Sequence, residues 1–126
     1  MVETKLLAAK ANRRACRALY LIADPGFDKF LTGIRHVEAV LIEHEISKDQ
    51  QLLLDSFYLL KKSFLELVRN SGNLSQSLLS FDNSKSIVST IEFLKSVDSI
   101  EIKNLVADIE NFIKTNSALQ ESLFSF

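Results

Sequence analysis

Residues that could do chemistry are few in this chain. It has two histidines, one cysteine and three glycines among 126 residues. His36 and His44 are eight residues apart, which on a helix is roughly 12 Å along the axis and too far for both to bind one metal ion. No Glu-x-x-His motif, His-Glu-x-x-His motif or pair of cysteines occurs. We expect His36 on the polar, solvated side of its helix and His44 at the edge of the core.

Glu38 and Glu45 are seven residues apart and therefore share one helical face. Two carboxylates on one face could bind a metal or raise each other's pKa. The favoured interpretation is a boundary position in which Glu38 pairs with Arg35 or with a neighbouring helix. Whether Glu38, His44 and Glu45 form any site is left open by the sequence.

Glycine-rich phosphate loops and the Gly-x-Ser-x-Gly nucleophile motif do not occur in the sequence. Together with the sparse histidines and the single cysteine, this predicts a protein that is not an enzyme. It also predicts no cofactor and no bound metal.

Four basic residues form the first candidate binding surface, because they recur at steps of three and four and so share one helical face. They are Lys10, Arg13, Arg14 and Arg17. Residues 1–23 carry a net charge of +4, and the remainder of the chain is acidic. This basic stripe predicts contact with an acidic partner or another polyanion.

Nucleic acid is the second choice of partner for the basic stripe. No aromatic residue is interleaved with the stripe, and the sequence pI of about 6.1 is low for a dedicated nucleic-acid binder. Residues 4–23 also fit a mitochondrial transit peptide, since they contain alanine and arginine but no acid. The simplest alternative is a solvated helix face, neutralised in part by acids of the final helix.

Apolar residues recur with helical periodicity along the chain. The first segment gathers small residues on one face, which would allow close approach to a neighbour: Ala8, Ala11, Ala15, Ala18, Leu19 and Ile22. The second stretch has Phe27, Phe30, Ile34, Val37 and Leu41 on one stripe. The third has Leu53, Phe57, Leu60, Phe64 and Leu67, with Leu54, Tyr58, Leu65 and Val68 beside them. So wide an apolar surface predicts a central helix, or one buried against a second chain.

Polar residues and Pro25 mark the expected helix boundaries. Asp24 is a candidate cap for the second helix, with Pro25 at its first position. Residues 47–50 and 98–101 fit capping boxes that open further helices, although the second and third helices could also be continuous. A short helix is expected over residues 74–81, and a longer one from about Ser84 that buries Ile87, Ile91 and Leu94.

The final helix supplies the second candidate surface, a heptad-like seam typical of a coiled coil with Asn116 at an a-type position. The residues predicted to form this protein interface are Leu105, Phe112, Asn116, Leu119, Leu123 and Phe126. The alternative is that the seam is the core face of a bundle helix.

These observations predict a single domain, residues 1–126, with an all-α, up-and-down bundle of four to five helices. The lone Cys16 favours a reducing compartment, cytoplasmic or another intracellular one, and no apolar run is long enough to span a membrane. We expect a non-catalytic interaction module that binds itself or a protein partner through apolar helical faces. The alternative is a nucleic-acid-associated accessory subunit that uses the basic first helix.

Overall fold

A computed structural model describes residues 2–24, 26–69 and 81–115 of the chain. These residues form helices and their connections, with no strand among them, which confirms the all-α class for this part of the chain. The helices are α1 (Val2–Ile22), α2 (Phe27–Ser47), α3 (Gln50–Arg69), α4 (Phe81–Lys95) and α5 (Ile100–Thr115). The expected short helix over 74–81 and the end of the final helix lie outside the described residues.

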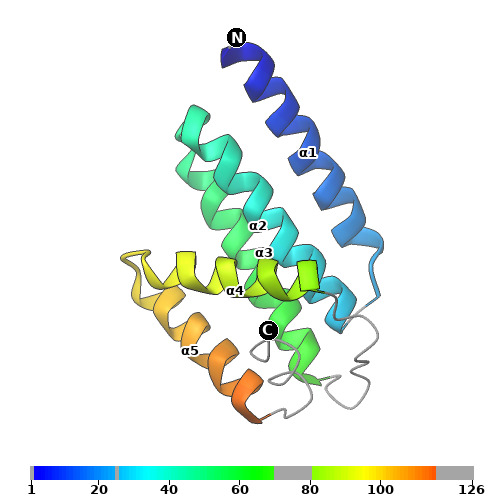
Figure 1. The fold of residues 1–126 in the computed structure, drawn as a ribbon, viewed down its shortest axis with the longest axis vertical. Coiled ribbons are helices and arrows are strands. Elements are labelled where there is room, and N and C mark those ends of the chain that lie inside the picture. Colours follow the sequence, from blue (N-terminus) through cyan, green and yellow to red (C-terminus); the bar gives the residue numbers. More distant parts are fainter. Residues whose placement is uncertain (1, 25, 70–80, 116–126) are drawn as a thin grey trace.

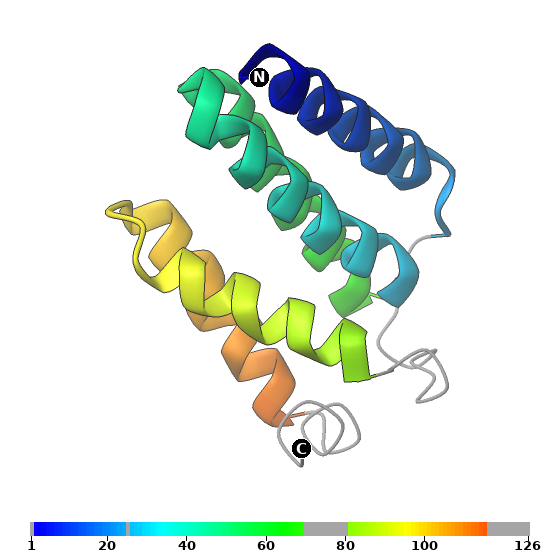
Figure 2. The same ribbon diagram turned by 45° about the horizontal axis from the view of Figure 1, so that its top comes forward.

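The central helix of the fold is α2. It packs against α1, α3 and α4, while α5 packs against α3 and α4 (Figures 1 and 2). In Figure 1, α4 crosses α2 at a wide angle, and α1 lies on the outside of the molecule. Of the two expectations for the third helix, the central position is therefore taken by α2 instead.

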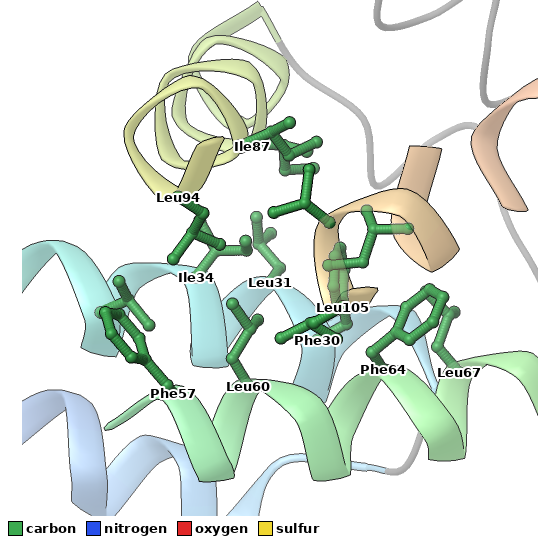
Figure 3. Packing of buried hydrophobic residues seen from close by; sticks show 14 of the residues in the cluster. Phe30, Leu31, Ile34, Phe57, Leu60, Phe64, Leu67, Ile87, Leu94 and Leu105 are labelled. Carbon is green, nitrogen blue, oxygen red and sulfur yellow. The ribbon is translucent and has the colours of Figure 1, made fainter. Parts of the chain in front are cut away.

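The hydrophobic core is built from α2, α3, α4 and α5. Its centre comes from side chains that are buried almost completely, such as Ile34, Leu60, Ile87, Leu94 and Ile109. Figure 3 shows the labelled side chains of α2 and α3 pointing toward α4 and α5, away from α1. The apolar stripes predicted for the second and third helices, and the burial of Ile87, Ile91 and Leu94, are confirmed. Among the described residues, α1 contributes no member of this core cluster.

The break between α2 and α3 is real, and it depends on two adjacent residues. Lys48 adopts the left-handed conformation (φ 57°) and ends α2, its N–H donating to the carbonyl of His44. Asp49 then caps α3, since its Oδ1 accepts a hydrogen bond from the N–H of Leu52 at 3.2 Å. At the start of α5, Ser99 Oγ accepts from the N–H of Ile102. The predicted helix starts are thus confirmed to within one or two residues, but the capping residues are Asp49 and Ser99, not Ser47 and Asp98, with which the predicted capping boxes began.

The start of α2 differs from the expectation that Asp24 caps it. The helix begins at Phe27, and Gly26 stands at the N-cap position with φ 117° and no side-chain cap. Glycine adopts this backbone conformation without steric cost, whereas other residues do not. The chain therefore turns into α2 at Gly26, two residues beyond the predicted cap.

Close packing of α2 on α3 depends on Gly33. A Cβ atom built at this position would lie 2.9 Å from Ser63 Oγ and 3.6 Å from Leu60 Cα. Ser63 itself is fully buried, and its hydroxyl donates to the carbonyl of Leu60. A side chain at position 33 would therefore force the Ser63 hydroxyl to move from its buried position.

The Gly33→Ala variant is expected to be less stable than the parent by about 1 kcal/mol, because overpacking outweighs the higher helix propensity of alanine. Urea unfolding followed by circular dichroism measures this difference. Adding Ser63→Ala removes the atom that clashes and should restore most of the lost stability. A Gly33→Ala protein as stable as the parent would contradict the close approach.

Candidate functional site

The four residues of the basic stripe do not form one solvent-facing set. Arg13 turns toward α2, where its Nε lies 2.6 Å from Oε2 of Glu43 and its Nη2 lies 3.5 Å from Oε1. Arg14 and Arg17 are exposed, and Lys10 is half-buried. The expectation that Arg13 meets an external polyanion together with the other three is therefore wrong, since Arg13 holds α1 on the rest of the fold.

Glu43 is the acid that neutralises part of the basic stripe, and sequence reasoning missed it. It is one of the few buried charged residues of the structure. The alternative considered above assigned this role to acids of the final helix, but α1 packs on α2 rather than on α5. The sequence did contain a signal for a buried polar site on this helix. His36 and Glu43 are seven residues apart, and so they share one face of a helix that is otherwise largely apolar.

His36 lies beside this ion pair, and its predicted position on the solvated side of the helix is wrong. It is 1% exposed, and its Nδ1 lies 3.1 Å from Ser56 Oγ on α3. Burial and the nearby Arg17 and Arg13 guanidinium groups together lower the pKa of His36 from 6.5 to about 4, against a smaller opposing effect of Glu43. The polar side of α2 is buried because α1 covers it.

A second polar contact fixes the other end of α1. The Tyr20 hydroxyl donates to the carbonyl of Leu59 on α3 at 3.0 Å, and Lys29 Nζ lies 5.0 Å from the centroid of the Tyr20 ring. Burial raises the pKa of Tyr20, as does the negative charge of Glu66, although a hydrogen bond with Ser63 opposes this. Polar contacts of Arg13 and Tyr20 therefore attach α1 to α2 and α3 near both of its ends.

The alanine-rich face of α1 points away from the protein. We define the α1 outer stripe as the apolar residues on this exposed face: Leu7, Ala8, Ala11, Ala15, Ala18, Leu19 and Ile22. Leu7 is 67% exposed and Ile22 is 78% exposed. Within the fold, the predicted close approach to a neighbour is not made through these alanines, because the opposite face, with Ala9, Arg13 and Tyr20, meets α2 and α3.

The predicted interface on the final helix is used within the chain where the structure describes it. Leu105 is buried in the core. Phe112 is half-buried and packs edge to face on Phe64, with ring centroids 5.8 Å apart. The described part of this seam therefore forms the core face of α5. Asn116, Leu119, Leu123 and Phe126 lie outside the described residues.

A second apolar strip is exposed on α3. We define the α3 outer stripe as Leu54, Tyr58, Lys61, Leu65 and Val68, which are all exposed. Leu54 is 57% exposed and Tyr58 is 65% exposed. This is the part of the wide apolar surface of the third helix that the core does not use. The sequence indicated its width, and the structure shows which side of α3 packs against α5 and which does not.

An open cleft of about 280 Å³ lies between α1, α2 and α4. Its lining mixes polar and apolar residues: Asn12, Cys16, Arg35, Glu38, Ile42 and Ser86. Burial raises the pKa of Glu38, against the lowering effects of a hydrogen bond from Ser86 and of the Arg35 charge. Burial likewise raises the pKa of the Cys16 thiol, which disfavours the nucleophilic thiolate.

Metal-binding chemistry has no support in the described ranges. No group of three or more His, Cys, Asp or Glu side chains there could hold a metal ion. Glu38 lies at the cleft, Glu45 is exposed and His44 is half-buried, so these three residues do not make such a group. Within the same ranges, every helix is too short or too polar to cross a membrane.

Comparison with known proteins found no similar protein. No family model, no curated protein and no solved structure matches this chain. The α1 outer stripe, with the exposed cations beside it, is therefore the candidate site on the geometry of the chain alone.

Proposed function

We propose that this chain is a non-catalytic protein-interaction module, a single up-and-down helical bundle that binds a partner over the outward face of α1. The observation that supports this most directly is the direction in which α1 faces. Arg13 and Tyr20 are directed inward to α2 and α3, and the apolar stripe, from Leu7 to Ile22, is directed to the outside. Contiguous apolar surface of this kind is typical of interaction sites.

The partner that fits this face is an amphipathic helix with acidic residues along one edge. Alanines at positions 8, 11, 15 and 18 leave room for a second helix axis to come close, because the distance between packed helices depends on the side chains at the contact. Arg14 and Arg17 are exposed on one flank of the α1 outer stripe. Acids on the partner would give these two arginines charge-assisted contacts and orient the complex.

The setting that we propose is a reducing intracellular compartment, because Cys16 is a free thiol and the only cysteine of the chain. Binding of nucleic acid by the exposed cations of α1 remains the alternative. Arg14 and Arg17 support it, but the apolar stripe beside them has no role in phosphate contact.

The experiment is a gentle affinity purification from the native source with two matched variants. The Ala11→Glu/Ala18→Glu variant places two charges on the α1 outer stripe, and Ala107→Glu places the same residue on the exposed side of α5. A stoichiometric protein that co-purifies with the parent and with Ala107→Glu should be reduced at least about tenfold by Ala11→Glu/Ala18→Glu, since both substitutions put a carboxylate into the contact.

Two outcomes would contradict the proposal. The first is a partner that binds Ala11→Glu/Ala18→Glu as well as the parent. The second is recovery of nucleic acid alone, bound in a nuclease-sensitive and salt-sensitive way. This result would indicate that α1 binds nucleic acid through Arg14 and Arg17. Circular dichroism of each variant checks that its helix content is unchanged.

A further inference from the structure

Helix α1 occupies a site on α2 and α3 whose chemistry is selective. We define the α1 seat by the residues that hold α1 or lie beside it: His36 and Glu43 of α2 and Leu59 of α3. Glu43 is buried and needs a cation, which Arg13 provides with its Nε 2.6 Å from Oε2. The carbonyl of Leu59 accepts the hydrogen bond of the Tyr20 hydroxyl at 3.0 Å. A helix therefore fits the α1 seat when it carries a cation and a hydrogen-bond donor seven residues apart, on one face.

The rest of the fold has a hydrophobic core of its own. The members of the core cluster that the structure describes come from α2, α3, α4 and α5, and none comes from α1. Among the described side chains of α1, only Ala9 and Tyr20 are buried. Helix α1 lies on the outside of the molecule and is joined to α2 by residues 23–26 (Figure 1). It can therefore leave its seat at a lower cost than unfolding of the core requires.

We propose that the α1 seat is a dimerisation surface, in which two copies of this chain exchange their α1 helices reciprocally. A second copy supplies a helix that meets the requirements of the seat, since its Arg13 and Tyr20 have the spacing that Glu43 and Leu59 demand. The contacts of the exchanged dimer are those of the single chain, with each ion pair formed between copies. Exchange of an identical element is a low-cost route to a two-fold dimer. The inference uses the inward face of α1, whereas the proposed function uses the α1 outer stripe, so the two are independent.

The connection between α1 and α2 sets the balance between the closed chain and the exchanged dimer. In the closed chain Gly26 has φ 117°, a conformation that other residues adopt only at a steric cost. The exchanged chain passes to the other copy instead of folding back, so residue 26 no longer needs a positive φ. Short hinges under strain favour exchange of this kind. Residues 23–26 extend to about 14 Å, so the exchanged dimer brings the Phe27 ends of the two α2 helices together.

Charge reversal on the two sides of the ion pair tests the exchange. In Arg13→Glu, α1 and its own seat carry like charges, and the same is true of Glu43→Arg. When the two variants are mixed, each α1 meets an opposite charge in the seat of the other copy, so both ion pairs are restored. Sedimentation equilibrium of the equimolar mixture should show a heterodimer at least about a hundredfold tighter than the homodimer of either variant.

Two controls separate exchange of α1 from simple attraction between copies. The double variant Arg13→Glu/Glu43→Arg restores the ion pair within one chain, so it should stay monomeric where the mixture is dimeric. A mixture of Arg14→Glu with Glu45→Arg reverses two exposed charges outside the α1 seat and should also stay monomeric. Circular dichroism checks that every variant is folded. A monomeric mixture of the two seat variants, or a double variant that dimerises as tightly as that mixture, would overturn the proposal.

The connection gives a second test with the ion pair intact. Closure within one chain has the advantage of an effective concentration in the millimolar range, so the parent should be monomeric at micromolar concentration and should exchange near about 1 mM. Gly26→Ala disfavours the closed turn and should raise the association constant at least about tenfold. Asp24→Ala is the matched control, because Asp24 is exposed and has no positive φ. An association constant for Gly26→Ala no higher than that of Asp24→Ala would overturn the proposal.

Discussion

Replacing Arg13 by alanine is expected to lower the free energy of unfolding by about 3 kcal/mol, the cost typical of removing one partner from a buried ion pair. Glu43 is buried, and its two oxygens both lie within hydrogen-bond distance of the Arg13 guanidinium. Without Arg13 the carboxylate would remain in a site that water does not reach. Urea unfolding followed by circular dichroism measures the loss.

The neighbouring residue provides the matched control. Arg14 is exposed, so Arg14→Ala should change the free energy of unfolding by no more than about 0.5 kcal/mol. Replacing both members of the pair, as in Arg13→Met/Glu43→Leu, should recover much of the stability, because no unpaired charge is left behind. Equal effects of Arg13→Ala and Arg14→Ala would show that the ion pair does not hold α1 in solution.

Acidification from pH 6.5 to pH 4 is expected to lower the free energy of unfolding by about 3 kcal/mol through His36 alone. The folded-state pKa of His36 is about 4, whereas the model value for an unperturbed histidine is 6.5. Between these two values the unfolded chain binds a proton that the folded chain excludes. The stability contributed by neutral His36 is therefore complete above pH 6.5 and is lost as the pH falls toward 4.

Variants separate His36 from the carboxylates that titrate in the same range. The difference in unfolding free energy between the parent and His36→Gln should change with pH over this window. His44→Gln should keep the pH dependence that His36 causes. The groups that face His36 are Arg13 and Arg17 from α1, Glu43 from its own helix and Ser56 from α3. If the pH dependence persisted unchanged in His36→Gln, His36 would not be its source.

Local signals predicted the helices and much of the core correctly. The capping boxes predicted at residues 47–50 and 98–101 located the starts of α3 and α5, although Asp49 and Ser99, not Ser47 and Asp98, are the residues that cap them. The apolar seams of α2 and α3 are buried as their spacing predicted, whereas the described part of the α5 seam forms the core face, which was the alternative to the predicted protein interface. These features depend on neighbours in sequence, so one sequence is sufficient to find them.

The orientation of α1 and the burial of His36 could not be found in this way. When an apolar stripe and several arginines lie on opposite faces of a helix, the usual expectation is that the apolar face packs inward. This expectation changes only if the acidic residue that pairs with an arginine inside the fold is known. That residue is Glu43, 30 residues further along the chain and on another helix. The polar side of α2 is buried for the same reason, since the helix that covers it is not adjacent to His36 in sequence. The candidate surfaces depend on this tertiary arrangement.

The attachment of α1 by polar contacts, outside the hydrophobic core, has a consequence for how the protein opens. Segments that bury little apolar surface form cooperative units that exchange their amide hydrogens at a lower free energy than the core does. We expect α1 to be such a unit, because it contributes no member of the described core cluster, and α2 to α5 to form the more protected one. When α1 lifts, water reaches both Glu43 and His36, and His36 can take up a proton. Acid therefore favours release of α1 before the core unfolds.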